Sequence, residues 1–211
     1  MSGRLGRSGA RAADRRRGRV RGWGRGRVRV LLVGHSYVWR LGRYMRQAPE
    51  RMNLGLRNAE VIWHGVGGAC LHPPRHTVEI LREVARLRPD IVYLHLGEND
   101  LGLRSEDQIV WDLLHFINNL IRECRSQVIV GQLLVFPVNL HLTHIIDSIN
   151  ERVRENMPPG HTFWRHESGL YPTQDVFLPE PDLVHLNEVG YGRYWRSIRT
   201  VVGRACRHLQ P

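Results

Sequence analysis

The chain has 211 residues, of which 42% are hydrophobic, enough for one domain with a buried core. Its formal net charge is +11, but residues 1–29 hold eleven arginines against one acid, a net of +10, which leaves the rest of the chain at +1. These numbers argue against a uniformly basic nucleic-acid-binding domain. A membrane-spanning chain is also not expected, because no apolar run approaches the roughly 20 residues that a transmembrane helix needs.

The arginines gather in an N-terminal segment. Residues 1–27 alternate Arg with Gly and are predicted to form a disordered tail, because glycine is conformationally free and like charges repel. Residues 1–29 are a candidate nucleic-acid-binding segment, since arginines bind phosphates. The first 27 residues lack a secretory signal, and Cys70, Cys124 and Cys206 form no CxxC pair. We therefore expect an intracellular protein, cytoplasmic or nuclear rather than mitochondrial.

The hydrophobic pattern changes at residue 28, where the expected domain begins. Up to residue 96, we predict in chain order a strand over 28–33, a helix over 40–47, a strand over 61–63, a helix over 77–88 and a strand over 91–96. The first strand is a β-branched run that ends at a glycine, and the second helix ends before a proline.

The second half of the domain continues the alternation of helices and strands. Ser105 is predicted to cap a helix whose first turn is acidic. A strand over 127–134, a helix over 142–156, a strand over 162–164 and a helix over 188–209 follow. Strands that alternate with helices of this length indicate βαβ units, a mainly parallel sheet covered on both faces, and a ligand site at the carboxyl ends of the strands.

Polar residues and glycines follow the first two predicted strands. Ser36, in Gly-His-Ser, would place its hydroxyl at the sheet edge and its amide at a helix N-terminus, although a serine there can equally be a helix cap. Three glycines at 65, 67 and 68 would let backbone amides face a ligand, or would simply serve a turn that needs positive φ.

Further polar residues follow the third strand and precede the last helix. Asn99 can donate a hydrogen bond into the same crevice, or can satisfy its own turn. Asp182 and His185 are spaced so that the carboxylate can meet Nδ1 and leave Nε2 as a proton acceptor, whereas a lone loop histidine is usually solvated. Ser, Gly, Asn, Asp and His thus follow one another along the chain, each at a strand end or in the last loop, which a chance set of residues would rarely do.

Four short blocks at these positions closely resemble the signature blocks of the SGNH (GDSL-like) hydrolase family. They are GHS at 34–36, VGGA at 66–69, GEND at 97–100 and DLVH at 182–185. The resemblance covers residues 28–208. It implies a domain over 28–211 that is a three-layer α/β/α sandwich with a flavodoxin-like five-stranded parallel sheet, the SGNH hydrolase fold.

The resemblance also implies an ester hydrolase that acts through an acyl-enzyme on a small acyl ester, without a cofactor or metal. In this family pattern Ser36 is the nucleophile, His185 the base and Asp182 the residue that orients it. The Ser36 amide, the Gly68 amide and the Asn99 side chain would form the oxyanion hole.

The first block departs from the family pattern. His35 stands where the family usually has Asp, a position that is not part of the family's catalytic set. An imidazole beside the serine would still change its hydrogen bonding. This Gly-His-Ser variant is similar to esterase-like domains of animals, including domains associated with retrotransposons.

Two other interpretations stay open at this point. His35, His64 and His95 lie on or next to predicted strands and, with Asp100 or Asp182, could hold a metal, but no HxH or HExxH spacing supports this. Alternatively, the domain is a weak or inactive hydrolase that serves as a binding module, with the arginine tail contacting nucleic acid.

Overall fold

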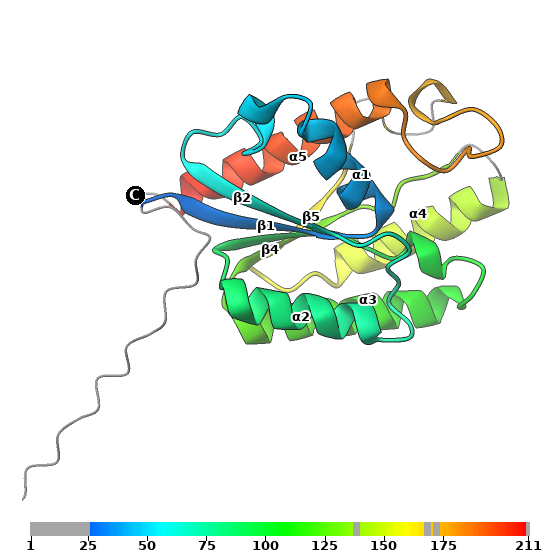
Figure 1. The fold of residues 1–211 in the computed structure, drawn as a ribbon. Helices are drawn as coiled ribbons and strands as arrows, with labels where there is room; N and C mark the ends of the chain where they lie inside the picture. The colour runs from blue at the N-terminus through cyan, green and yellow to red at the C-terminus, as the bar shows by residue number, and fades with distance from the viewer. Residues whose placement is uncertain (1–25, 137–139, 167–169, 171–173, 210–211) are drawn as a thin grey trace, which may run out of the picture.

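The computed structural model describes residues 26–136, 140–166, 170 and 174–209 (Figure 1). The predicted Arg/Gly tail, its disorder and its nucleic-acid contacts lie almost wholly outside these residues. The first strand begins at Val28, as the change in hydrophobic pattern predicts.

The five predicted strands form one parallel sheet in the order β2-β1-β3-β4-β5, which confirms the flavodoxin-like order. The strands are β1 (Val28–Gly34), β2 (Ala59–Gly65), β3 (Ile91–His95), β4 (Gln127–Gly131) and β5 (Thr162–Trp164). β3 is buried along its whole length, because a central parallel strand is covered on both faces. The strand therefore consists mostly of apolar residues, whereas a half-exposed strand alternates apolar and polar residues.

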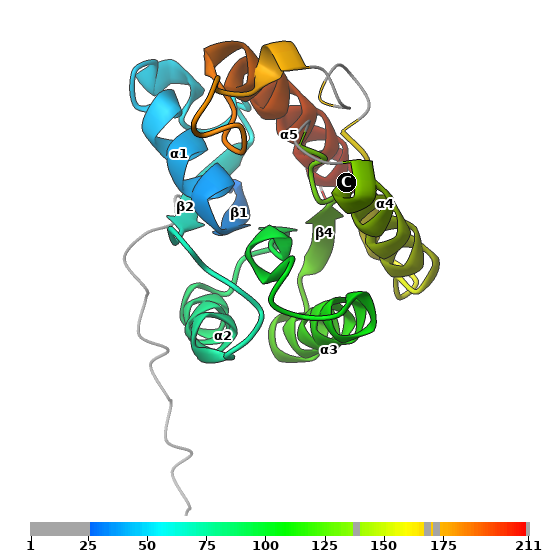
Figure 2. The ribbon, with the colours of Figure 1, turned by 90° about the vertical axis from the view of Figure 1, so that its right-hand side faces the viewer.

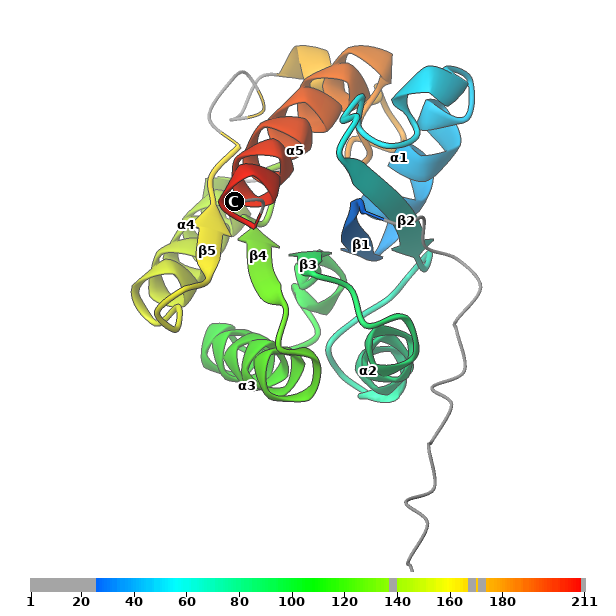
Figure 3. The ribbon, with the colours of Figure 1, turned by 90° about the vertical axis from the view of Figure 1, so that its left-hand side faces the viewer.

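In the described part of the chain, five α-helices cover the two faces of the sheet. They are α1 (Ser36–Met45), α2 (Arg75–Leu87), α3 (Glu106–Cys124), α4 (Leu140–Glu155) and α5 (Glu188–His208), with short 3-10 turns η1 (Pro49–Arg51), η2 (Glu98–Asp100) and η3 (Gln174–Val176). α1 and α5 lie over one face, and α2 and α3 over the other, with α4 packed beside α3 (Figures 2 and 3). Within the described residues, no helix has the length and apolar character needed to cross a membrane.

The predicted α3 is confirmed in detail. The Ser105 hydroxyl oxygen accepts a hydrogen bond from the Gln108 amide, and the Ser105 amide donates one to the side-chain oxygen of Gln108, so the helix begins with a capping box. One apolar face of this helix is buried, including Ile109, Leu113 and Leu120.

Several element boundaries differ from the prediction, most clearly those of α1, β2 and β4. α1 begins at Ser36 rather than at residue 40, and β2 is longer than 61–63 because its whole length pairs with β1. β4 ends at Gly131 rather than at residue 134. The segment beyond it stays buried, but Leu133 pairs with a side chain instead of a strand. Its amide donates to the side-chain oxygen of Asn150 at 2.7 Å, and its carbonyl accepts from the side-chain NH₂ of Asn150 at 3.0 Å. These backbone groups are therefore not available for the β ladder.

Candidate active site

The site lies where β1, β2 and β3 end at the same level of the sheet. Gly34 is in register with Gly65 of β2 on one side and with His95 of β3 on the other. β1 is the point where the strand order reverses, and parallel sheets bind their ligands outside the carboxyl ends of strands at this point. The segments that follow these three residues therefore share one edge of the molecule.

Ser36 stands at the first position of α1, directly after β1. A Cβ on Gly34 would lie 2.2 Å from the carbonyl oxygen of His95, so only glycine allows β1 to approach β3 so closely. The His35 amide also donates to that oxygen, at 3.3 Å. Because Ser36 is the first helical residue, its own amide has no acceptor within the helix and is free to face a ligand.

The structure brings Ser36, His185 and Asp182 together. Nε2 of His185 lies 3.1 Å from Oγ of Ser36, and Nδ1 lies 2.8 and 2.9 Å from the two carboxylate oxygens of Asp182. An ionised carboxylate can only accept, so Nδ1 carries the proton and Nε2 presents its lone pair to the serine hydroxyl. This is the geometry in which an imidazole can remove the hydroxyl proton.

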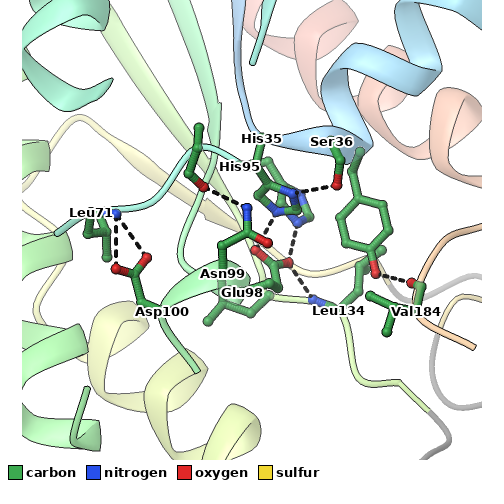
Figure 4. Close-up of polar contacts among 12 residues, drawn as sticks. His35, Ser36, Leu71, His95, Glu98, Asn99, Asp100, Leu134 and Val184 are labelled. Carbon is green, nitrogen blue, oxygen red and sulfur yellow. Dashed lines mark hydrogen bonds and ion pairs between the residues drawn. The ribbon is translucent and has the colours of Figure 1, made fainter. Parts of the chain in front are cut away.

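The loop that carries His185 is a tight turn built around the same carboxylate. Asp182 also accepts from the backbone amides of His185, at 2.8 Å, and Val184, at 3.3 Å, while Leu183 adopts a left-handed φ of 49°. Partial burial works against ionisation of Asp182, but these hydrogen bonds hold its pKa below the ordinary value. The hydroxyl of Tyr37 on α1 donates to the Val184 carbonyl at 2.6 Å and fixes the loop against the serine helix (Figure 4).

The residues after β3 fasten the loop that follows β2. The side-chain amide of Asn99 donates to the Ala69 carbonyl at 2.7 Å, which leaves its second N–H available. Asp100 is buried and accepts from the amides of Leu71, at 2.8 Å to the nearer oxygen, and His72, at 3.0 Å. Neither side chain closes its own turn, which was the alternative interpretation from the sequence.

Gly68 lies on this fastened loop, one residue before the carbonyl that Asn99 binds. Its φ of 72° is a conformation that other residues adopt with strain, and no atom comes within 4 Å of the place of a Cβ. Among the described residues, its amide donates to no backbone acceptor. Gly68 does not line the cavity at the serine, whereas Ser36, Asn99 and His185 do.

That cavity has a volume of about 270 Å³. Besides the polar groups at its floor, it is lined by the apolar side chains of Leu101, Phe136, Leu142 and Val184. A space of this size lies just below the range of drug-sized ligand sites, so it suits a small group.

A buried cluster that sequence reasoning did not identify lies beside the serine. Nε2 of His35 is 2.7 Å from one oxygen of Glu98, and Nε2 of His95 is 2.5 Å from the other (Figure 4). The Leu134 amide donates to Glu98 at 3.1 Å, and Nδ1 of His35 lies 3.3 Å from the Ser36 hydroxyl. Burial opposes ionisation of Glu98, but the two imidazoles outweigh it and hold the pKa of Glu98 well below its ordinary value.

The cluster bears on the metal interpretation. In the described part of the chain it is the only group of three histidine, cysteine or acidic side chains with donor atoms close enough to share an ion. It contains two of the three histidines singled out in the sequence, but His64, Asp100 and Asp182 are not part of it. N–H donors of the two imidazoles account for its short contacts, so we assign it to hydrogen bonding.

The sequence matches no protein-family model and no curated protein, whereas its fold matches many solved structures. One is an acetyl esterase mutant crystallised with acetate, with 18% identity and a TM-score of 0.63 over 87% of this chain and all of that one. A family 3 carbohydrate esterase of Clostridium thermocellum has 18% identity and a TM-score of 0.63 over 87% and 99% of the two chains.

A member of the lipolytic G-D-S-L family from Veillonella parvula is equally similar. It has 18% identity and a TM-score of 0.63 over 84% of this chain and 99% of that one. The chain thus has the SGNH hydrolase fold that its four sequence blocks predict, over nearly the full length of these proteins.

Proposed function

We propose that this chain is a serine esterase that hydrolyses short-chain carboxylic esters through an acyl-enzyme. The observation that carries the proposal is the alignment of Ser36, His185 and Asp182, with contacts of 2.8–3.1 Å from hydroxyl to imidazole to carboxylate. A nucleophile, a base within hydrogen-bond reach and a third group that orients the base together define this chemistry.

In the first half of the reaction, His185 accepts the hydroxyl proton at Nε2 while Oγ of Ser36 bonds to the acyl carbon. The imidazolium then gives this proton to the leaving alcohol as the C–O bond to the alcohol breaks. In the second half a water molecule attacks the acyl-enzyme, with His185 again taking and returning a proton. Asp182 holds the ring and stabilises the imidazolium in both halves.

The carbonyl oxygen of the ester becomes negatively charged in both transition states. Three donors are candidates to stabilise it: the Ser36 amide, the second N–H of Asn99 and the Gly68 amide. Asn99 and Gly68 are coupled, because the Asn99 side chain holds the loop of Gly68 through Ala69. Donors fixed before the reaction stabilise developing charge without reorganisation.

The substrate class follows from the cavity. A volume of about 270 Å³ with apolar walls accommodates a short acyl group better than a fatty chain. The acetyl and carbohydrate esterases among the similar structures are consistent with this choice.

The test is hydrolysis of p-nitrophenyl acetate by the wild type and by Ser36→Ala, with p-nitrophenyl decanoate as the long-chain comparison. We expect the acetate to be cleaved faster than the decanoate, and Ser36→Ala to leave only background turnover. Ser148→Ala is the matched control, because this serine lies on α4, outside the cavity lining, and hydrogen-bonds Glu106. Equal rates for the wild type and Ser36→Ala would overturn the proposal.

A further inference from the structure

The hydroxyl of Ser36 has a second imidazole within hydrogen-bond distance. Nε2 of His185 lies 3.1 Å from Oγ, and Nδ1 of His35 lies 3.3 Å from the same atom. Each imidazole contacts a carboxylate through its other nitrogen, Asp182 for His185 and Glu98 for His35. A serine hydroxyl has one proton to donate, so the protonation of His35 decides what the second contact does.

The protonation of His35 depends on a buried chain of hydrogen bonds that ends on Glu98. The chain crosses from β5 through α5 and β3, and each of its contacts is between 2.5 and 3.3 Å. Its members, in order, are Trp164, Ser197, His166, Tyr93, Tyr194, His95 and Glu98.

The two ends of this chain fix the direction of its protons. The indole N–H of Trp164 can only donate, and the ionised carboxylate of Glu98 can only accept. Each hydroxyl and each neutral imidazole between them has one hydrogen that it can donate in a hydrogen bond. His166 is neutral, because burial and the neighbouring His95 hold its pKa well below the ordinary value. The arrangement that places one proton in every contact therefore has every donor pointing toward Glu98.

This direction determines the tautomers of both imidazoles beside Glu98. His95 accepts from Tyr194 at Nδ1 and donates from Nε2 to Oε1 of Glu98, which also accepts from the Leu134 amide. The other oxygen of Glu98 is then left to accept from Nε2 of His35. In the neutral form of His35, Nδ1 then carries a lone pair, and this lone pair faces the hydroxyl of Ser36.

We propose that His35, held in this tautomer by Glu98, is a second general base for Ser36. The inference rests on the proposed esterase function and adds to it. In the step, Oγ of Ser36 bonds to the electrophile, its proton moves to Nδ1 of His35, and the leaving group departs. The resulting imidazolium is paired with the Glu98 carboxylate at 2.7 Å.

The test uses the rate at which diisopropyl fluorophosphate labels Ser36 in the full-length protein. In this reaction the Oγ–P bond forms, the P–F bond breaks, fluoride leaves and the base keeps the serine proton. We expect His185→Ala to retain slow labelling of Ser36. Adding His35→Gln, whose amide can still reach Glu98 but which is no base, should lower that residual rate at least tenfold, since a general base contributes about 10²–10⁴.

In the protein that keeps His185, His35→Gln should lower the labelling rate by a much smaller factor than it does in the His185→Ala protein. This non-additivity is expected when two bases can accept the same proton. The matched control is His161→Gln in the His185→Ala protein. This histidine accepts from the Val128 amide at the opposite end of the sheet, and its replacement should leave the residual rate unchanged. If His185→Ala labels equally fast with and without the added His35→Gln change, the inference is overturned while the proposed function stays intact.

Glu98→Gln provides a second variant. The amide oxygen can replace Oε1, and the NH₂ group then faces His35 and donates to its Nε2. The proton of His35 moves to Nδ1, which becomes a donor to Ser36 instead of a base. In the His185→Ala protein we expect this variant to lose the residual labelling too, and its retention would contradict the inference. A wild type that does not label at Ser36 would instead overturn the proposed function, and this inference with it.

Discussion

Two carboxylate–imidazole pairs meet at the hydroxyl of Ser36, and they are built in opposite ways. Asp182 and His185 are three residues apart on one loop, with side chains that are 29% and 22% exposed. Glu98 and His35 come from different strand ends, 63 residues apart, and their side chains are 3% and 2% exposed. The loop pair is local and partly exposed, whereas the buried pair joins β1 to β3.

Because the two pairs differ in burial, they are expected to contribute differently to folding stability and to the reaction rate. An exposed ion pair stabilises a fold by about 1 kcal/mol at most, so the loop pair is free to serve chemistry. A buried carboxylate is stable only while its partners are present, so removal of Glu98 leaves three buried donors without an acceptor. We therefore expect the loop pair to govern rate, and the buried pair to govern both rate and stability.

The largest expected effect is on the loop pair. In Asp182→Asn, the amide would donate to Nδ1 of His185 and force the proton onto Nε2, where it faces Ser36. Loss of the correct tautomer should lower kcat for p-nitrophenyl acetate by up to about 10⁴, with little change in thermal stability. Asp175→Asn, which removes the carboxylate that pairs with Arg193, is the matched control. Full activity of Asp182→Asn would contradict the expectation that the loop pair governs the reaction rate.

Removing the buried carboxylate should act on folding. Glu98→Ala should lower the free energy of unfolding by about 3–5 kcal/mol, because His35, His95 and the Leu134 amide lose their acceptor. Urea denaturation measures this loss. Asp182→Ala should change stability by less than about 1 kcal/mol, and similar losses for both variants would show that the two pairs do not differ as described.

Asn99 follows Glu98 in the chain, but its proposed role is to donate a hydrogen bond to the developing oxyanion. Asn99→Ala should raise the activation free energy by about 2.7–4 kcal/mol, the usual cost of losing one oxyanion donor. The loss should appear in kcat more than in KM, since the charge develops only in the transition state. Asn156→Ala at the end of α4 is the control, and a change confined to KM would contradict the assignment of Asn99.

The smallest expected effect is the dependence of stability on pH, which should come from the buried chain. The pKa of His166 is lower in the folded protein than its unfolded value of about 6.5. As the pH falls below this value, the unfolded chain binds a proton at His166 that the folded protein does not bind. The contribution of this group to the free energy of unfolding is therefore greatest above pH 6.5 and is lost on acidification.

For this one group the loss at pH 5 has an upper limit of about 2 kcal/mol, which applies if folded His166 binds no proton at that pH, and urea denaturation at pH 7 and pH 5 measures it. His166→Gln should reduce the difference between the two pH values, whereas His141→Gln on the exposed start of α4 should not. A wild type that is equally stable at both pH values would rule out a neutral buried His166.

Most of the fold could be predicted, because β-branched runs, glycines and the Ser105 cap are local signals of strands, turns and helix ends. Local signals were weaker at the ends of elements. Tyr37 and Val38 precede the helix predicted over 40–47 but lie buried in the first turns of α1. The buried segment after Gly131 reads as strand, yet Asn150 from a distant helix takes its hydrogen bonds.

In the candidate site too, residues with local sequence signals could be predicted, whereas a residue that depends on distant partners could not. Ser36, Asn99, Asp182 and His185 were singled out because each follows a strand or precedes a helix. Glu98 was missed, because the value of a buried carboxylate depends on partners that come together only in the fold. A signal was present in the sequence: His35, His95 and Glu98 are all ionisable residues at the ends of neighbouring parallel strands.

The proposed esterase chemistry requires that the hydroxyl of Ser36 be an activated nucleophile. The most direct measurement is mass spectrometry of the wild type and Ser36→Ala after incubation with diisopropyl fluorophosphate at neutral pH, with peptide mapping of the adduct. We expect one phosphoryl adduct per wild-type chain, located on Ser36, and none on Ser36→Ala. An unlabelled wild type, or an adduct that persists in Ser36→Ala, would contradict it.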